Sequence, residues 1–393
     1  MKEYKYLYRK MLDRNVIRAA YKKLRKGKTK RNEIKYIDAH LEQEVEKMRE
    51  MILNTRPCNV EHPEKAFRPP EHQPKIIHEH GKDRIIYMPD IYEQWLHHII
   101  VQILEPIVRA TAYPYSCGSF PNRGAHYGKE RLVKWIHSEK NLRYFAKLDI
   151  RHFYNNIRHD VLKRELEIRI KDEWFIHIIM LCLSSFDKGV PLGFYISQWL
   201  ANYFLEPLDK AIMENHKVYM RYMDDMVIFG GNKKELHKEV EKIKMLLGQR
   251  FRLRLKDNYQ VSKFIYKGKG RCLDYMGFKF YREKTTMRKS IMISAVRLAR
   301  KLYKAKASGR GYYYLWIYAM ISYMGWFSNT DTYACYWHNI KPMVDIGKLK
   351  TIISRRDRHE SMEKRTLQQT TVGASADIDR TVHAAQKHPS GTP

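Results

Sequence analysis

Apolar residues recur along the chain at spacings that change several times, and each change predicts a different kind of element. Residues 1 to about 70 show helical spacing, for example from Leu41 to Ile52, which predicts packed helices. An extended linker is predicted between residues 57 and 74, where prolines disfavour helix at the residues that precede them. A β-hairpin is then expected over residues 74–77 and 81–89, and a helix over residues 92–110.

The central and C-terminal parts of the chain alternate between strand-like and helix-like runs. A strand is predicted to end at Asp149, and residues 218–230 (VYMRYMDDMVIFG) read as two short buried strands joined by a tight turn. Helices are predicted over residues 161–183, 199–212 and 233–247, and a strongly basic helical region begins near residue 285. The apolar run at 312–327 predicts a buried helix, since it is too short and too rich in tyrosine for a membrane span.

The balance of charge indicates the kind of partner. The chain carries 74 Lys and Arg against 43 Asp and Glu, a net charge of +31 that points to a polyanion such as nucleic acid. The charge is spread through the chain and is not concentrated on one amphipathic helix, so no membrane partner is expected. Five scattered cysteines without CxxC spacing, and an N-terminus without the apolar core of a signal peptide, predict a cytoplasmic protein.

Candidate chemistry lies in the acids that interrupt the apolar runs. Asp224 and Asp225 are adjacent in an apolar setting, where two carboxylates repel unless cations neutralise them. Asp149, at the end of the upstream strand, supplies a third carboxylate, and such acids can hold two Mg²⁺ ions for nucleotidyl transfer. A solvated turn at Asp224 and Asp225 and a helix cap at Asp149 are the alternative interpretations.

Four ordered segments between residues 149 and 278 resemble motifs of the bacterial reverse transcriptases. They are the YxDD box Tyr222–Asp225, the aspartate box at Asp149, the GxxxSQ-like box Pro191–Gln198 and the primer-grip segment Leu273–Phe278. The resemblance implies an α+β right-hand polymerase with fingers, a palm that carries an antiparallel sheet, and a helical thumb. The domains expected from it are a basic helical extension at 1–73, fingers and the start of the palm at 74–148, the palm with inserted finger helices at 149–282, the thumb at 283–350, and a polar, disordered tail at 351–393.

The same resemblance implies roles for individual residues. The catalytic and metal-binding set is Asp149, Asp224 and Asp225, with the backbone of Ile150 near the metals, which would be two Mg²⁺ ions that Mn²⁺ can replace. Residues expected to bind the incoming nucleotide are Lys75, Arg84, Arg123, Tyr154, Gly193, Gln198 and Lys256. Residues expected to contact template or primer are Leu192, Ser197, Tyr222, Met223, Met276 and Gly277.

Three of these positions carry a more specific expectation. Tyr154 falls at the family's sugar gate, where an aromatic ring excludes a 2′-hydroxyl. Lys256, with Lys263 as the alternative, matches the lysine that approaches the leaving pyrophosphate. Arg123 is expected to take over a triphosphate contact, because Phe120 stands where relatives commonly have arginine.

The function implied is RNA-directed DNA synthesis from deoxynucleoside triphosphates, on template RNA and an RNA/DNA hybrid. Leu192 before Gly193, with Ser197-Gln198 after it, is similar to reverse transcriptases of diversity-generating retroelements, which copy a template RNA with errors at adenines and use an accessory variability protein. Two alternatives remain. One is a phage-defence or retron-type reverse transcriptase with a non-coding RNA, and the other is a maturase-like RNA-binding splicing cofactor. Each would be a bacterial or phage-encoded protein.

Overall fold

The computed structural model describes residues 2–57, 61–79, 82–309 and 311–358. The chain divides into two compact units, with the boundary between Met276 and Gly277. Across the described residues, no helix combines the length and the apolar character that crossing a bilayer would require.

The first unit begins with helices that pack around a long central helix. They are α1 (Leu7–Met11), α2 (Arg14–Arg25), α3 (Asn32–Ala39), α4 (Leu41–Asn54) and the central α5 (Ile91–Thr111). The Trp95 indole of α5 donates a 2.9 Å hydrogen bond to the Ile17 carbonyl of α2, deep in the core. Asp13 and Asp90 cap the N-termini of α2 and α5 by accepting hydrogen bonds from backbone amides. The predicted helices before residue 57 are therefore present.

A short 3-10 turn, η1 (Pro63–Lys65), and the predicted β-hairpin lie between α4 and α5. The hairpin pairs β1 (Pro74–Glu79) with β2 (Lys82–Tyr87) in antiparallel register. Lys75 lies opposite Ile86 and Ile77 lies opposite Arg84. Because successive residues of a strand face opposite sides, Lys75 and Arg84 share one face of the hairpin.

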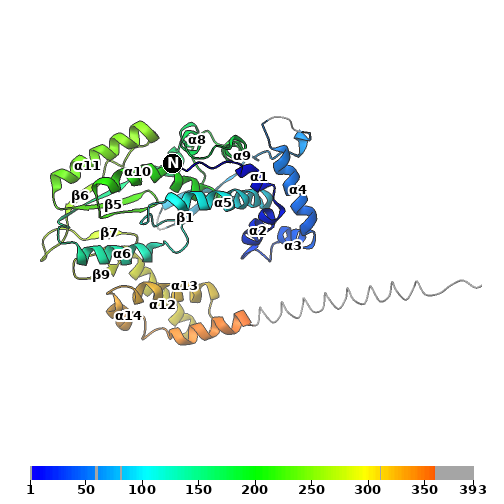
Figure 1. Cartoon of the computed structure of the whole chain (residues 1–393). Coiled ribbons are helices and arrows are strands. Elements are labelled where there is room, and N and C mark those ends of the chain that lie inside the picture. Colours follow the sequence, from blue (N-terminus) through cyan, green and yellow to red (C-terminus); the bar gives the residue numbers. More distant parts are fainter. Residues whose placement is uncertain (1, 58–60, 80–81, 310, 359–393) are drawn as a thin grey trace, which may run out of the picture. The chain divides into compact units, whose positions relative to one another are not determined.

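A four-stranded antiparallel sheet forms the centre of the first unit, in the order β4-β5-β3-β6. Its strands are β3 (Tyr144–Asp149), β4 (Tyr219–Tyr222), β5 (Asp225–Gly230) and β6 (Gln260–Lys263). Figure 1 shows α10 (Ser197–Asn215) and α11 (Lys233–Leu246) on one side of this sheet, and α11 continues into a π-helical turn, η2 (Leu247–Phe251). The strand predicted to end at Asp149 and the helix predicted at 233–247 are confirmed.

The helix predicted over residues 161–183 is wrong in one respect, because the structure has two helices there. After α6 (Ala125–Ser138) and the short α7 (Phe153–Asn156), the chain forms α8 (His159–Glu167) and α9 (Glu173–Leu183). Asp172 separates them: its carboxylate accepts hydrogen bonds from the Phe175 amide at 3.1 Å and the Tyr8 amide at 2.8 Å. The same side chain therefore starts α9 and attaches α1.

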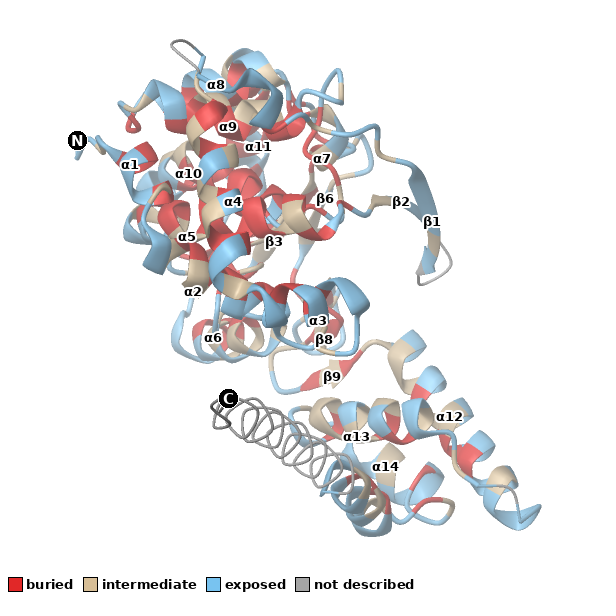
Figure 2. Ribbon diagram, turned by 90° about the vertical axis from the view of Figure 1, so that its right-hand side faces the viewer, coloured by how far each residue is buried: buried red, intermediate tan, exposed pale blue. Residues whose placement is uncertain are grey.

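The second unit is smaller and mostly helical. After β7 (Leu273–Tyr275) ends the first unit, it contains β8 (Phe278–Phe280), β9 (Thr285–Met287), α12 (Lys289–Ala307), α13 (Tyr314–Ser328), α14 (Tyr333–Asn339) and a helix at residues 346–358. Figure 2 shows fewer buried residues in α12, α13 and α14 than in α5, α9 and α10.

Two expectations for this unit need correction. The helix predicted at 312–327 forms as α13 but is largely not buried, since only Ile317, Met320 and Phe327 are buried and Leu315 is 62% exposed. The polar tail expected from residue 351 begins later, because the last helix continues through residue 358 with Ile353 buried. Residues 359–393, for which disorder was predicted, lie outside the described residues.

Candidate catalytic site

The pairing of strands brings the three predicted aspartates to one end of the central sheet. Asp149, the last residue of β3, lies directly opposite Asp225, the first residue of β5. Asp224 occupies the turn between β4 and β5, and its carbonyl accepts a hydrogen bond from the Ile150 amide at 3.3 Å. Segments more than 70 residues apart therefore place three carboxylates side by side. The alternative of a helix cap at Asp149 has no support here, because the aspartate ends a strand.

Electrostatic repulsion is built into this cluster. Burial, with further contributions from the neighbouring Asp149 and Asp224 carboxylates, raises the pKa of Asp225 to about 7 despite the opposing charge of Lys147. Burial and the charge of Asp149 also raise the pKa of Asp224. Carboxylates whose pKa values are raised by burial and by one another gain stability from a bound cation.

Two lysines partly neutralise the acids. Lys256 Nζ lies 2.7 Å from Asp149 Oδ1. Lys147 Nζ lies 3.5 Å from Asp225 Oδ2 and donates a 2.8 Å hydrogen bond to the Asp274 carbonyl. Lys147 was missed by the sequence reasoning. Its signal was a lysine two residues before Asp149 inside a central strand, which places both side chains on the same face.

One carboxylate oxygen of the three acids is available to bind a divalent metal ion. Asp225 Oδ1 is buried and has no hydrogen-bond partner, so it is an oxygen left for a ligand. The described part of the chain holds no group of three His, Cys, Asp or Glu side chains arranged as a ready metal cage. Mg²⁺ commonly binds through one or two carboxylates together with water and substrate phosphates, which suits this open edge. Asp149, Asp224 and Asp225 are the residues that would hold it.

A buried ion pair stabilises the turn that carries Asp224. Arg221 is 1% exposed, and its guanidinium donates two hydrogen bonds to the Asp209 carboxylate of α10, at 2.7 and 2.6 Å. A third bond, 3.0 Å long, reaches the Met223 carbonyl. Met223 has φ 57°, so the turn is left-handed at a residue that is not glycine. Arg221 thus fixes the backbone immediately before the two aspartates.

A tyrosine from β7 holds the other side of the turn. The Tyr275 hydroxyl donates to the Asp225 carbonyl at 2.8 Å, and the Tyr275 ring is fully buried. Together with Lys147, which reaches the neighbouring Asp274, this bond joins the aspartate turn to the predicted primer-grip segment. None of these supporting residues was identified from the sequence.

Several residues predicted to bind the nucleotide lie near the acids. Burial raises the pKa values of Asp224 and Tyr154, and the charge of Arg84 opposes both shifts, so Arg84 lies near these two residues. Burial and the Asp224 charge raise the pKa of Tyr154, whose carbonyl accepts a 2.8 Å hydrogen bond from the Val190 amide. Tyr154, the residue predicted to be the sugar gate, therefore lies near Asp224.

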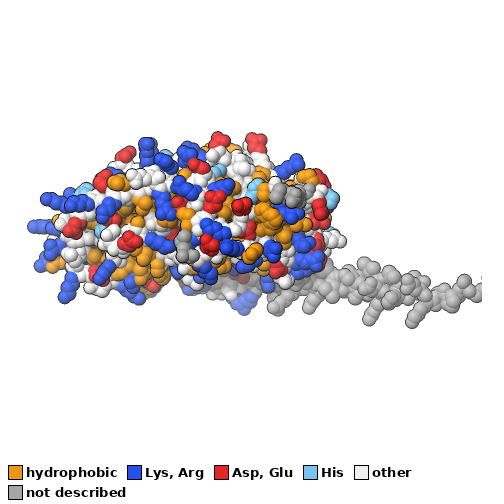
Figure 3. Space-filling model, turned by 45° about the horizontal axis from the view of Figure 1, so that its top comes forward, with side chains coloured by type: hydrophobic (Ala, Val, Ile, Leu, Met, Phe, Trp, Pro, Cys, Tyr) orange, Lys and Arg blue, Asp and Glu red, His pale blue; other side chains and the backbone are white. Residues whose placement is uncertain are grey.

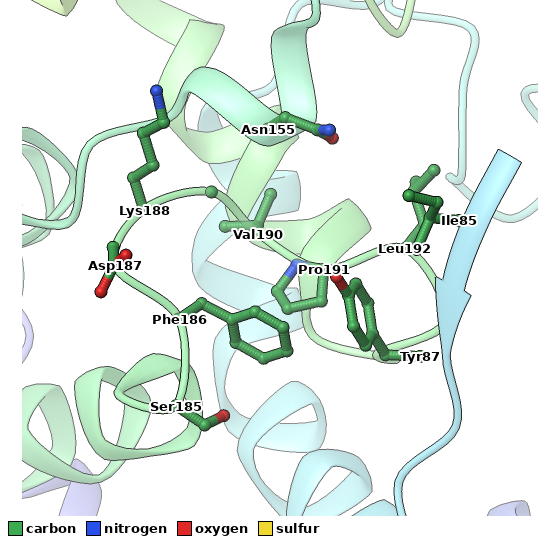
Figure 4. Close-up of a pocket in the computed structure, with 11 residues that line it drawn as sticks. Ile85, Tyr87, Asn155, Ser185, Phe186, Asp187, Lys188, Val190, Pro191 and Leu192 are labelled. Atoms are coloured by element: carbon green, nitrogen blue, oxygen red, sulfur yellow. The ribbon is translucent and has the colours of Figure 1, made fainter. Parts of the chain in front are cut away.

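In the loop before α10, the residues predicted to contact nucleotide or template make contacts within the protein. Gly193 has φ 105°, and a Cβ there would lie 2.0 Å from the Tyr87 carbonyl, so the glycine is required by the hairpin. The Leu192 carbonyl accepts a 2.8 Å hydrogen bond from the Tyr87 amide. Figure 4 shows Leu192 beside Ile85 at the edge of a cavity of about 410 Å³, which Tyr87 and Pro191 also line. The Ser197 hydroxyl is buried and donates to the Pro191 carbonyl at 2.6 Å.

Other predicted residues have contacts of their own, and Tyr222 lies opposite Asp225 in the pairing of β4 and β5. The Arg123 guanidinium reaches the Tyr113 carbonyl at 3.4 Å and lies over the Phe120 ring, so it stabilises its own loop. Gln198 is exposed on the first turn of α10, and Tyr222 is half-buried near Cys117. Met276 and Gly277 both have positive φ and form the turn after β7.

Comparison with known proteins gives the family. Residues 70–280, more than half of the chain, match the family described as reverse transcriptase (RNA-dependent DNA polymerase). The chain belongs to this family, and the predicted α+β fold is confirmed.

Its curated relatives are distant. The chain is 23% identical over 148 residues to protein YkfC of Escherichia coli, which covers 35% of this chain and 39% of that protein. It is 25% identical over 172 residues to the group II intron-encoded protein LtrA of Lactococcus lactis, covering 41% of this chain and 28% of that protein. The chain thus spans well under half the length of these relatives.

Similar solved structures include telomerases. One from Candida albicans, in complex with a TWJ fragment of telomeric RNA, has a TM-score of 0.45 and 10% identity, and covers 68% of this chain and 60% of that one. An apo telomerase from Candida tropicalis has a TM-score of 0.42 and 12% identity, and covers 54% of this chain and 47% of that one.

Proposed function

We propose that the protein is an RNA-directed DNA polymerase that copies a template RNA into DNA. The observation that carries the proposal is the placement of Asp149 opposite Asp225, with Asp224 in the adjoining turn, inside a region that belongs to the reverse transcriptase family. The net charge of +31 supports a nucleic-acid substrate. Figure 3 shows Lys and Arg side chains spread widely over one face of the molecule, with no single patch holding them all.

In the proposed reaction, the primer 3′-oxygen forms a bond to the α-phosphorus of a deoxynucleoside triphosphate, and the bond to pyrophosphate breaks. Two bound Mg²⁺ ions would lower the pKa of the 3′-hydroxyl and neutralise the leaving pyrophosphate. Asp149, Asp224 and Asp225 would hold these ions. Lys256, already 2.7 Å from Asp149, can donate a proton or a hydrogen bond to the departing pyrophosphate.

The residues around the acids would select the sugar and bind the triphosphate. Tyr154 lies beside Asp224 with its backbone held by Val190, so its ring can exclude a ribose 2′-hydroxyl by volume. Lys75 and Arg84, on one face of the hairpin, would contact the phosphates. Catalysis of this kind depends on positioning and charge stabilisation and needs no covalent nucleophile.

Primer extension on an RNA template tests the proposal. Asp225→Asn should lower the extension rate by roughly a thousandfold, because a neutral amide binds Mg²⁺ poorly. Binding of an RNA/DNA hybrid, measured in parallel, should stay unchanged. Asp160→Asn, an exposed acid on α8, is the matched control and should extend normally. Normal synthesis by Asp225→Asn would refute the assignment of the catalytic acids.

For the biological role, we propose error-prone copying of a dedicated template RNA in a diversity-generating retroelement. Leu192, at the edge of the cavity beside Ile85, is the residue on which this rests. Leu192→Gln should reduce misincorporation opposite template adenine, and an unchanged error spectrum would remove Leu192 from the proposal.

Sequencing the cDNA made in cells and the RNA that co-purifies with the protein separates the alternatives. A structured non-coding RNA would favour a defence or retron-type role. An intron RNA would favour a splicing cofactor, a role that the similarity to a group II intron-encoded protein keeps open. A repeat RNA whose cDNA differs at adenines, together with a small accessory protein, would support diversification.

A further inference from the structure

A dense basic segment in the N-terminal helices has no role in the site described above. Residues 22–31 end α2 and form the turn toward α3, with Gly27 at φ 78°. Arg25 is ion-paired with Asp38 at 2.7 Å. No acid occurs within the segment, and its exposed cations are Lys22, Lys23, Arg25, Lys26, Lys30 and Arg31.

This basic segment is fixed in place against α5. The Tyr21 and Trp95 rings lie 4.8 Å apart in the core between α2 and α5, and Figure 1 and Figure 2 both show these helices next to each other. Lys28 Nζ donates a 2.9 Å hydrogen bond to the Gln94 side chain of α5. The position of the segment relative to α5 therefore depends on buried packing and a direct bond.

One turn further along the same face of α5, an exposed aromatic ring lies over a histidine. Residues four apart on a helix are neighbours, so His98 follows Gln94 on that face. The Tyr195 ring stacks on His98 with centroids 3.9 Å apart and planes 18° apart, and Tyr195 is 40% exposed. Tyr195 belongs to the loop between Gly193 and the exposed Gln198.

Two lysines and one glutamate act on this stack. Burial and the charges of Lys28 and Lys23 lower the pKa of His98 to about 4, so the imidazole is neutral at neutral pH and the lysines lie close to it. The charge of Glu105 also acts on Tyr195, but Glu105 is ion-paired with Arg109 at 3.1 Å. An exposed tyrosine face thus lies next to a cluster of cations.

We propose that Tyr195 and the basic segment 22–31 together bind a single-stranded stretch of RNA, the part of the template that is not yet copied. An unpaired base can stack on the tyrosine ring while the adjacent phosphates contact the lysines and arginines. A duplex offers no free base face, so the arrangement selects a single strand. The identification of this strand as template rests on the proposed function, because Tyr195 lies in the loop between Gly193 and Gln198, two residues predicted to bind the incoming nucleotide.

Binding to two hybrids tests the surface without requiring synthesis. One RNA/DNA hybrid carries a ten-nucleotide unpaired 5′ RNA extension, and the other carries one unpaired nucleotide. Tyr195→Ala should weaken binding of the long-extension hybrid about tenfold and leave the short-extension hybrid unchanged. Tyr195→Phe keeps the ring and should bind both as the wild type does. Equal affinity of Tyr195→Ala and wild type for the long extension would overturn the proposal.

A charge variant tests the second half of the surface. Replacing Lys22, Lys23, Lys26 and Lys30 together with Gln should make the long-extension affinity less salt-dependent, by about three units of the log–log slope. The matched control replaces Lys233, Lys234, Lys238 and Lys242 of α11, which are also exposed. An equal change of slope in both variants would mean a general effect of net charge and would overturn the proposal.

The two proposals can fail separately. If the enzyme is active but binds both hybrids equally well, only the proposed single-strand surface is refuted. If the wild-type protein is inactive but still binds the long-extension hybrid more tightly, the polymerase proposal is refuted and the single-strand surface is supported.

Discussion

The hairpin with the predicted catalytic acids and the hairpin with the predicted triphosphate-binding cations are built in opposite ways. The β4–β5 hairpin is buried along its length, and Arg221, Tyr275 and Lys147 all support its turn. The β1–β2 hairpin exposes apolar residues, with Ile76 at 59% and Ile85 at 51% exposure. It is joined to the loop before α10 by the bond from the Tyr87 amide to the Leu192 carbonyl.

The difference follows from what each hairpin would bind. Carboxylates that share small, strongly hydrated ions must hold their oxygens at fixed separations, so their backbone is supported by buried hydrogen bonds. Cations that bind a triphosphate arriving from solvent depend more on long side chains that can extend to it than on a rigid backbone. The buried hairpin should therefore respond to substitution through stability and rate, and the exposed hairpin through substrate affinity.

The largest expected effect is on the buried hairpin. Arg221→Met leaves the Asp209 carboxylate buried without its partner and should lower the free energy of unfolding by about 3–5 kcal/mol. Urea denaturation followed by circular dichroism measures this. Lys210→Met, on the same helix as Asp209, removes an exposed lysine from Glu206, which keeps its ion pair with Arg169, so stability should change by under about 1 kcal/mol. A similar loss in both variants would contradict the special role of Arg221.

A second effect depends on pH. Because the pKa of Asp225 is raised to about 7 in the folded protein, protonated Asp225 favours folding, and that contribution is lost as the pH rises from about 4 through 7. Without divalent metal at pH 8, Asp225→Asn should therefore be more stable than the wild type, by about 2–4 kcal/mol. Melting curves between pH 5 and pH 8 measure the difference. It should shrink when Mg²⁺ is added, and a variant of equal stability at pH 8 would contradict the prediction.

Lys147 joins the aspartate turn to β7 and should affect rate. Lys147→Met removes both its contact with Asp225 and its bond to the Asp274 carbonyl, so the extension rate should fall by about 30-fold, with more Mg²⁺ needed for half-maximal rate. Lys147→Arg should recover part of the rate because it keeps the charge. A lower rate with unchanged Mg²⁺ dependence would indicate that Lys147 does not position Asp225.

The smallest effect is expected in the exposed hairpin. Arg84→Ala should raise KM for the deoxynucleotide about tenfold, since it removes one charged contact to the triphosphate, and should leave the melting temperature unchanged. His78→Ala, on the opposite face of the same hairpin, should alter neither quantity. Loss of stability in Arg84→Ala would show that the two hairpins are more alike than their burial suggests.

Local patterns were sufficient to predict the β1–β2 hairpin and the strands β3, β4 and β5 with the acids at their ends, but not β6 or the short strands β7, β8 and β9. The alternation of apolar residues on either side of Asp149 and Asp224 is a property of neighbouring residues, and the order of the motifs along the chain was typical of the family. The break between α8 and α9 depended on Asp172, whose capping role competes with an apolar pattern that continues at helical spacing.

The supports of the site could not be predicted in the same way. Arg221 and Asp209 are 12 residues apart on different elements, and Lys147 meets the Asp274 carbonyl across 127 residues. The spacing of apolar residues in the sequence does not indicate such pairs, because they depend on how the elements pack. For Gly193 and Ser197 the motif predicted contacts with nucleic acid, and the structure adds a packing role within the loop that the motif did not indicate.

The left-handed turn at Met223 also brings together two positions that are far apart in the sequence. A side chain at Gly118 would meet the Met223 sulfur at 2.3 Å, so the methionine thioether fills the volume that glycine leaves. Among homologous chains, a small residue in place of Met223 should permit a bulkier one in place of Gly118, and the reverse exchange should be rare. The identity of the variable residue in the YxDD box would then depend on its packing partner, Gly118.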